Sequence, residues 1–229
     1  MGLLQQQIAY YRARSGEYDE WFYRQGRYDR GPEVNQRWFA EAQAVAEALD
    51  AFQPSGSVLE LACGTGIWTE RLLRHANTIT AVDASPEVLE LNARRLRSDK
   101  VCYVEADLFA WEPSERFDVV FFSFWLSHVP PERFEDFWEL VRRALRPQGR
   151  FFFVDSHCEP TSTALDHASP DFTATQSTRR LNDGREFAIY KIFYDPPALE
   201  ERLERLGWSA SVTRTPNYFI YGYGRPTAP

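Results

Sequence analysis

Short apolar runs separated by amphipathic stretches dominate the middle of the chain. Five of these runs read as buried strands, at 58–61, 78–82, 101–104, 119–122 and 151–154. Each is followed by polar or amphipathic sequence that can form a helix. Such alternation is typical of βαβ units around a parallel sheet whose two faces are covered by helices. The pattern therefore predicts an α/β fold.

The last third of the chain breaks this rhythm and then resumes it. Within 156–195, a polar linker precedes two strand-like runs around Asn182-Asp183-Gly184, which is a strong hairpin signal. We expect this segment to form an inserted β-hairpin cap above the sheet. A helix should begin at Pro196, and strands at 210–214 and 218–223 should complete the sheet. Residues 146–149 are expected to turn the chain into the fifth strand.

The first 35 residues hold too many aromatic side chains for a disordered tail. We expect residues 1–35 to form a helical arm that closes over the site as a lid, although aromatic residues at this spacing are equally typical of a packing face. A helix should follow at 37–52. With 229 residues in total, the chain fits a single domain, 1–229.

Composition narrows the classes of function. The formal net charge of −7 and the pI near 5.2 argue against binding to nucleic acid. No apolar run approaches the roughly 20 residues that cross a bilayer, and the first residues do not resemble a signal peptide. We therefore expect no membrane association and a cytoplasmic location. The three cysteines and four histidines show no metal-ligand spacing, so we expect reduced thiols and no metal.

The turn after the first predicted strand is the first candidate for ligand binding. It reads Ala62-Cys63-Gly64-Thr65-Gly66, and glycines there let a ligand approach the backbone at the start of a helix. A nicotinamide dinucleotide would fit the same pattern, but Trp68 stands where that motif wants a small packing residue, and we expect its indole to block the place of a pyrophosphate. Glu60 would repel a pyrophosphate and could instead hold an ammonium group.

Further polar residues follow the next predicted strands. Asp83 ends the second strand and can accept hydrogen bonds from two ribose hydroxyls, or it can simply cap the following helix. Asp107 and Leu108 follow the third strand and suit an adenine amino group and ring face. Phe124 follows the fourth. Carboxyl ends of parallel strands meet at one edge, where open α/β sheets bind ligands.

These motifs resemble class I S-adenosylmethionine (SAM)-dependent methyltransferases. The resemblance covers residues 56–155 closely, and the last helix and strands more loosely. It implies a Rossmann-like seven-stranded methyltransferase sheet with helices on both faces, SAM as cofactor and a small-molecule acceptor. The family more often has glycine at Ala62, and alanine should be tolerated there unless the backbone needs a positive φ. The expected cofactor-binding residues are Tyr11, Tyr18, Glu60, Ala62, Cys63, Gly64, Gly66, Asp83, Ala84, Asp107, Leu108 and Phe124.

A smaller group is similar over nearly the whole chain. Residues 10–14, 17–19, 125–130 and 183–185, together with Lys191, resemble the phosphonate O-methyltransferases of dehydrophos biosynthesis and their relatives. This resemblance implies a role in natural-product biosynthesis. The arm around Tyr28 and the linker after His157 match that group poorly, so the acceptor can differ.

An anionic acceptor oxygen needs cations to bind it rather than a base. The best candidates are Lys191 and one arginine of the hairpin. A two-residue loop would put Arg180 on the face of Lys191, whereas a bulged three-residue loop would put Arg179 there. The resemblance favours Arg179, and Tyr28 is expected to contact the acceptor. Solvated basic residues on an ordinary hairpin remain the alternative.

His128 follows the crevice segment and offers a second chemistry. It can act as a base for a neutral amine or hydroxyl acceptor, or it can cap a helix. Two other classes of function stay open from the residues alone. One is an NAD-dependent oxidoreductase, and the other is a non-catalytic SAM-binding protein without an organised acceptor pocket.

Overall fold

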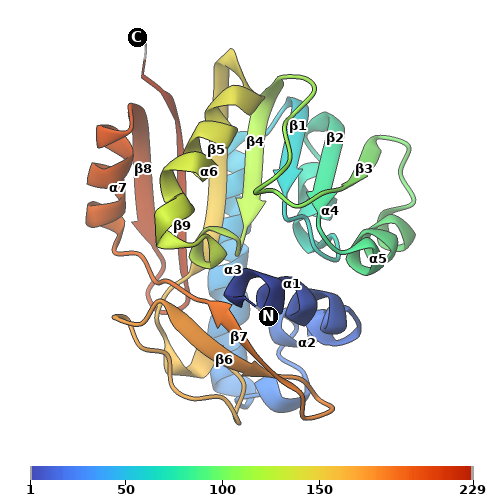
Figure 1. Ribbon diagram of the computed structural model, residues 1–229, viewed down its shortest axis with the longest axis vertical. Coiled ribbons are helices and arrows are strands. Elements are labelled where there is room, and N and C mark those ends of the chain that lie inside the picture. The colour runs from blue at the N-terminus through green and yellow to red at the C-terminus, as the bar shows by residue number, and fades with distance from the viewer. Residues whose placement is uncertain (1, 228–229) are drawn as a thin grey trace.

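The computed structural model describes residues 2–227. Seven strands form one sheet, which Figure 1 shows from its face. From one edge to the other the strands are β3 (Val101–Glu105), β2 (Ala76–Asp83), β1 (Gly56–Leu61), β4 (Phe117–Ser123), β5 (Leu145–Ser156), β9 (Phe219–Pro226) and β8 (Trp208–Arg214). The first five are parallel, and β9 runs antiparallel to both of its neighbours. The Rossmann-like seven-stranded sheet expected from the sequence is confirmed.

Helices cover both faces of the sheet. One face packs against α3 (Pro32–Phe52), α4 (Ile67–Leu72) and α5 (Pro86–Leu96), and the other against α6 (Phe134–Ala144) and α7 (Pro196–Arg205). Side chains alternate between the two faces along each strand. Phe121 therefore packs on the α3 side and Phe122 on the α6 side, and each is fully buried. Burial on both faces explains why the central strands read as continuous apolar runs.

Local sequence fixes where the helices begin. Pro86 and Pro196 occupy first-turn positions, where a missing N–H costs nothing. Ser85 and Asp195 cap these helices by accepting hydrogen bonds from the N–H groups of Val88 and Ala198.

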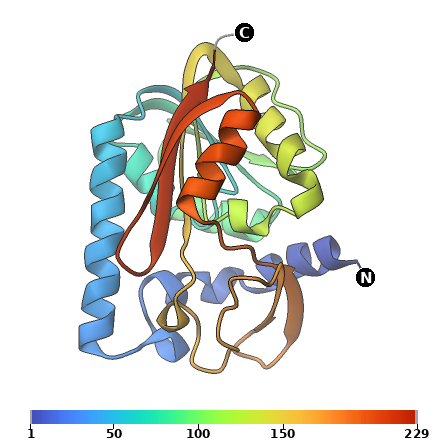
Figure 2. The same cartoon turned by 90° about the vertical axis from the view of Figure 1, so that its left-hand side faces the viewer.

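The arm and the hairpin lie together beneath the carboxyl ends of the parallel strands (Figures 1 and 2). The arm contains α1 (Leu3–Ala13), α2 (Tyr18–Phe22) and the short 3-10 turns η1 (Ser15–Glu17) and η2 (Gly26–Tyr28). The hairpin pairs β6 (Gln176–Arg180) with β7 (Glu186–Tyr190). Three further 3-10 turns are η3 (Leu126–His128), η4 (Pro131–Arg133) and η5 (Pro160–Ser162).

A buried glutamine joins the arm to the hairpin. Gln7 of α1 accepts a hydrogen bond from the N–H of Tyr190 at 3.0 Å and donates one to the carbonyl of His128 at 3.1 Å. One side chain thus connects α1, β7 and η3.

The largest differences from the predicted boundaries lie at the starts of α3 and β5. α3 begins at Pro32, ahead of the expected start at residue 37, because Pro32 suits the first helical position. The turn expected at 146–149 lies within β5, as an irregularity in its pairing with β4. Gly149 permits this bulge, since a Cβ there would come within 3.0 Å of the carbonyl oxygen of Phe117.

Candidate active site

A cleft of about 850 Å³ opens at the carboxyl edge of β1, β2, β3 and β4, with α1 along one side. Nine of the twelve expected cofactor-binding residues line it: Tyr11, Tyr18, Ala62, Gly64, Asp83, Ala84, Asp107, Leu108 and Phe124. The other three, Glu60, Cys63 and Gly66, do not belong to the lining of this cleft.

The turn after β1 is held to the end of β2 by one carboxylate. Asp83 accepts hydrogen bonds from the N–H groups of Gly64 and Ser85, each at 3.0 Å. The N-cap of α5 is Ser85, so Asp83 is not the cap of that helix. Burial raises the pKa of Asp83, and the backbone N–H groups oppose that shift.

Gly64 and Gly66 have different roles in this turn. Gly64 has a φ of +53° and lies under the Tyr18 ring at the cleft. Gly66 has a φ of +91°, and a Cβ there would lie 2.6 Å from Oδ1 of Asn92. Gly66 therefore permits α4 to pack closely against α5, which is a structural role.

Glu60 lies behind the cleft and is fully buried. Among the described residues, neither of its carboxylate oxygens has a hydrogen-bond partner at normal geometry. Burial raises the pKa of Glu60 to about 8, the nearby Thr69 hydroxyl opposes part of this shift, and the charge of Asp83 adds to it. An unpartnered buried carboxyl beside the cleft fits a cofactor that carries an ammonium group.

Trp68 does not stand where the sequence placed it. The indole packs among Phe22 and Phe121, with ring centroids 6.4 and 6.0 Å away, and it does not line the cleft. Its bulk therefore does not block a pyrophosphate. The reason is that α4 turns this position toward α3 and the arm rather than toward the ligand edge.

A second cavity of about 610 Å³ lies between the arm, the hairpin and the end of β5. It shares four lining residues with the cleft: Tyr11, Tyr18, Phe124 and His128. Phe124 has a φ of +52°, which is rare for a bulky residue and marks strain at this junction. The cavity also contains Tyr28, Arg179 and Lys191, the three expected substrate-binding residues. No aspartate or glutamate belongs to its lining.

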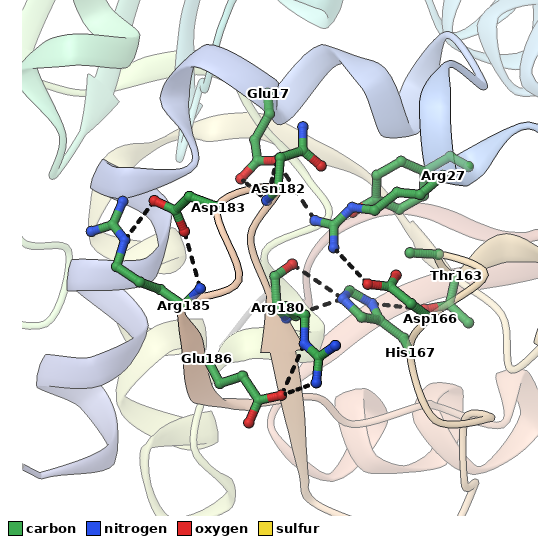
Figure 3. A network of polar contacts seen from close by, with 12 residues as sticks. Glu17, Arg27, Thr163, Asp166, His167, Arg180, Asn182, Asp183, Arg185 and Glu186 are labelled. Atoms are coloured by element: carbon green, nitrogen blue, oxygen red, sulfur yellow. Dashed lines mark hydrogen bonds and ion pairs between the residues drawn. The ribbon is translucent and has the colours of Figure 1, made fainter.

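The hairpin loop has three residues. Leu181 donates its N–H to the carbonyl of Arg185 at 2.9 Å, and Gly184 has a φ of +89°. This bulged loop turns Arg179 into the cavity and Arg180 outward, where Arg180 forms an ion pair with Glu186 (Figure 3). Of the two alternatives left by the sequence, the structure has the one with Arg179 beside Lys191.

Lys191 is buried and held by three groups. Its Nζ donates to the hydroxyls of Ser127 at 2.9 Å and Ser156 at 3.1 Å, and it lies 3.6 Å from Oδ1 of Asp155. Asp155 is fully buried and accepts hydrogen bonds from the backbone N–H groups of Ser127 and Ser156. Burial lowers the pKa of Lys191 to about 8, although Asp155 opposes the shift. Lys191 is thus mostly charged at neutral pH.

His128 has hydrogen bonds at both ring nitrogens. Nδ1 lies 2.6 Å from the carbonyl oxygen of Tyr190, so Nδ1 must carry a proton and donate it. Nε2 then accepts from the Tyr11 hydroxyl at 2.7 Å. Burial and the nearby cations, Lys191 first, lower the pKa of His128 well below its usual value. Neither nitrogen is free to take a proton directly from an acceptor.

Polar contacts fix the hairpin to the arm and to the loop before it (Figure 3). Glu17 accepts the N–H of Asn182 at 2.9 Å and pairs with Arg27, which in turn pairs with Asp166 at 3.4 Å. Nε2 of His167 accepts the N–H of Arg180 at 3.0 Å. His167 also lines the cavity, so these contacts hold one of its walls in place.

Sequence reasoning missed two charged residues of the site. Arg14, at the end of α1, is buried and lines the second cavity, and Asp155 supports Lys191. A signal for Arg14 was available: Gln7, Tyr10, Tyr11 and Arg14 have the spacing of one helix face. Asp155 ends an apolar strand, and only the fold shows that Lys191 reaches it.

Comparisons with known proteins agree with this geometry. Residues 58–149 match the family model described as a methyltransferase domain. The solved structure of a DhpI–SAH complex is 39% identical, with a TM-score of 0.79, and the alignment covers 100% of this chain and 98% of that one. A DhpI–SAM–HEP complex is 42% identical, with a TM-score of 0.80 and 98% of each chain covered. The chain belongs to the class I SAM-dependent methyltransferases. Within that class it stands near DhpI, and SAM is its cofactor.

Curated sequence relatives share a shorter region. The uncharacterized methyltransferase sll0829 of Synechocystis sp. is 32% identical over 109 residues, which are 47% of this chain and 50% of that protein. The chain spans about half the length, or less, of the first curated relatives it matches. Within residues 2–227, no helix is long and apolar enough to cross a membrane, and no three side chains of His, Cys, Asp or Glu gather as a metal site.

Proposed function

We propose that the protein transfers the methyl group of SAM to an anionic oxygen of a small molecule, a phosphonate or else a carboxylate. The observation that carries this proposal is the charge of the acceptor cavity. Arginine and lysine side chains line it, acidic side chains do not, and it meets the cofactor cleft at Tyr11, Tyr18, Phe124 and His128. The solved complex of the DhpI relative holds HEP together with SAM, which supports a site for a second compound in this chain.

The residues of this chain have defined tasks in such a reaction. Bound SAM supplies an electrophilic methyl group on a sulfonium. Arg179 and Lys191 would bind the acceptor anion and set its angle to that methyl, because an ionised oxygen is already nucleophilic and needs orientation. Asp83 would hold the ribose hydroxyls, Asp107 and Leu108 the adenine, and Glu60 the ammonium group. The arm and the hairpin would exclude water from the junction.

The geometry gives less support to a neutral acceptor with His128 as its base. Both ring nitrogens of His128 are engaged, and the surrounding cations disfavour its protonation. We assign His128 instead to holding the Tyr11 hydroxyl at the junction. For His128 to act as a base, a proton from the acceptor would have to reach Nε2 through the Tyr11 hydroxyl.

Arg179→Ala and Lys191→Ala test the anion pocket. With the best anionic acceptor from a screen of phosphonates, carboxylates, phenols and amines, each change should lower kcat/KM by about 10²-fold or more, as expected for a partly buried charge contact. SAM affinity, measured by calorimetry, should change little. Arg180→Ala serves as the matched control because that side chain faces outward. Full activity in both variants, with neutral amines or phenols as the best acceptors, would overturn the proposal.

A further inference from the structure

Arg14 is a buried cation without a carboxylate partner. Only 8% of the residue is exposed, and among residues 2–227 no aspartate or glutamate forms an ion pair with it. Its guanidinium lies over the rings of Tyr10, Tyr18 and Tyr28, at 5.6, 5.0 and 5.9 Å from their centroids. Among the residues that the structure describes, the guanidinium makes one hydrogen bond, a long one of 3.4 Å to the Tyr28 hydroxyl. Buried arginines are normally paired.

The aromatic cage holds this charge at the wall of the acceptor cavity. Arg14, Tyr10, Tyr18 and Tyr28 all belong to its lining. The Tyr10 hydroxyl and Nε of Arg14 are buried without a hydrogen-bond partner among the described residues. Two unpartnered donors at one cavity, one of them charged, indicate a ligand with acceptor oxygens.

The charges around the cavity can be counted. Arg14, Arg179 and Lys191 contribute three positive charges, and Asp155, paired with Lys191, contributes one negative charge. Arg179 also lacks an ion pair within the described residues and hydrogen-bonds to the Ser177 hydroxyl at 2.9 Å. Two positive charges are left without a counter-charge.

We propose that Arg14 is a third anion-binding group of the acceptor pocket, so that the reacting group of the acceptor carries two negative charges when it binds. This inference rests on the proposed function and narrows it from anions in general to dianions such as a phosphonate or phosphate monoester. Methylation of one oxygen moves a methyl from sulfur to oxygen and leaves a monoanionic ester with a neutral thioether. The product then brings one negative charge to a pocket with two unpaired positive charges, and this mismatch favours release of the product.

The inference is tested by the binding of two model anions to protein loaded with S-adenosyl-L-homocysteine (SAH), the thioether that remains when SAM has given up its methyl group. Methylphosphonate represents the dianion and acetate the monoanion, and calorimetry just below pH 8 reports both affinities. The native protein should bind methylphosphonate at least tenfold more tightly than acetate. Arg14→Gln should weaken methylphosphonate binding by about tenfold to a hundredfold, and acetate binding much less, since one charge-assisted contact is lost. Arg14→Lys keeps the charge and should keep part of the preference.

Control measurements distinguish the role of Arg14 from the proposed function on which it rests. Arg37→Gln removes an exposed arginine of α3 and should change neither affinity. SAH affinity reports whether each variant is folded, and Arg14→Met, which also removes the charge, replaces Arg14→Gln should the latter not fold. If native protein prefers methylphosphonate and Arg14→Gln or Arg14→Met leaves the preference unchanged, the role of Arg14 is wrong while the anion pocket stands. If native protein binds neither anion, the proposed function itself fails.

Discussion

Glu60 shows how burial can prepare one side chain for a ligand. With a pKa of about 8, this carboxyl is mostly protonated at neutral pH, whereas an unfolded glutamate titrates near 4.3. The pKa of Glu60 is higher in the folded protein than in the unfolded chain, so protonation of Glu60 stabilises the ligand-free fold. This contribution to the free energy of unfolding is complete below about pH 4.3. This contribution is lost as the pH rises through about 8. An ammonium group beside Glu60 would reverse this preference and favour the carboxylate.

Binding of SAM should therefore release about one proton from Glu60 near neutral pH, and almost none well above pH 8. Calorimetry in buffers of different ionisation enthalpy measures this number directly. Glu60→Gln should abolish the release and weaken binding. Binding heats at neutral pH that do not depend on the buffer would refute the assignment of Glu60 to the ammonium group.

Ala62 is strained by its own backbone. Its φ is +54°, so the condition under which alanine is unfavourable at this position is met. Left-handed backbone costs an alanine about 1–2 kcal/mol, which exceeds the entropy that glycine adds to the unfolded chain, about 0.4–1 kcal/mol. Ala62→Gly should raise the unfolding free energy by up to about 1 kcal/mol, or Tm by about 2–4 °C.

Ala84→Gly is the matched control for this prediction. Ala84 also lines the cleft, but its φ is not positive. The same change there should lower Tm. Equal responses of the two variants in thermal unfolding would show that the backbone strain at Ala62 does not matter.

At the scale of elements, most of the fold could be predicted from the pattern of apolar and polar residues. The central strands could be predicted because their residues are apolar on both faces, and the residues at their carboxyl ends then had to share one edge. Asp83, Asp107 and Phe124 were placed at the cleft by that argument alone. The start of β5 could not be predicted, because the bulge at 146–149 arises from pairing with β4.

Side-chain direction on short helices was harder to predict. Trp68 follows the glycine turn, yet the six residues of α4 turn it away from the ligand edge. The face of the hairpin depended on one residue in its loop, so sequence alone left Arg179 and Arg180 as alternatives. Gln7 and Arg14 lie on one face of α1, but their contacts to η3, the hairpin and the cavity depend on tertiary packing. Contacts between elements distant in sequence are what pattern analysis cannot supply.

At the scale of the molecule, α1 and the hairpin pack against each other as a roof (Figure 2). Residues of α1 line both cavities, whereas Arg179 of the hairpin lines the second cavity alone. The two elements are joined by Gln7 to the N–H of Tyr190, and by the side chain of Gln6 to the N–H of Ala188 at 3.2 Å. Arg12 connects the roof to the sheet edge through Glu105 at 3.4 Å, but this ion pair is exposed and weak. Lys191, just after β7, also joins the roof to Asp155 and Ser156 of β5, whereas the two glutamines couple α1 directly to β7.

We expect α1 and β7 to open as a single unit when ligands enter and leave. Hydrogen–deuterium exchange should then give similar protection for the amides of Leu3–Ala13 and Glu186–Tyr190, and SAH should slow both together. Gln7→Ala leaves the N–H of Tyr190 and the carbonyl of His128 unpaired, at a cost of about 1–3 kcal/mol per group, so exchange in both segments should speed up by about tenfold or more. Exchange in α6, on the far face of the sheet, should not change, and Gln43→Ala, on the exposed side of α3, should have no effect. Faster exchange in α1 alone, with β7 still protected, would mean that the arm moves over a fixed hairpin and that the roof is two parts.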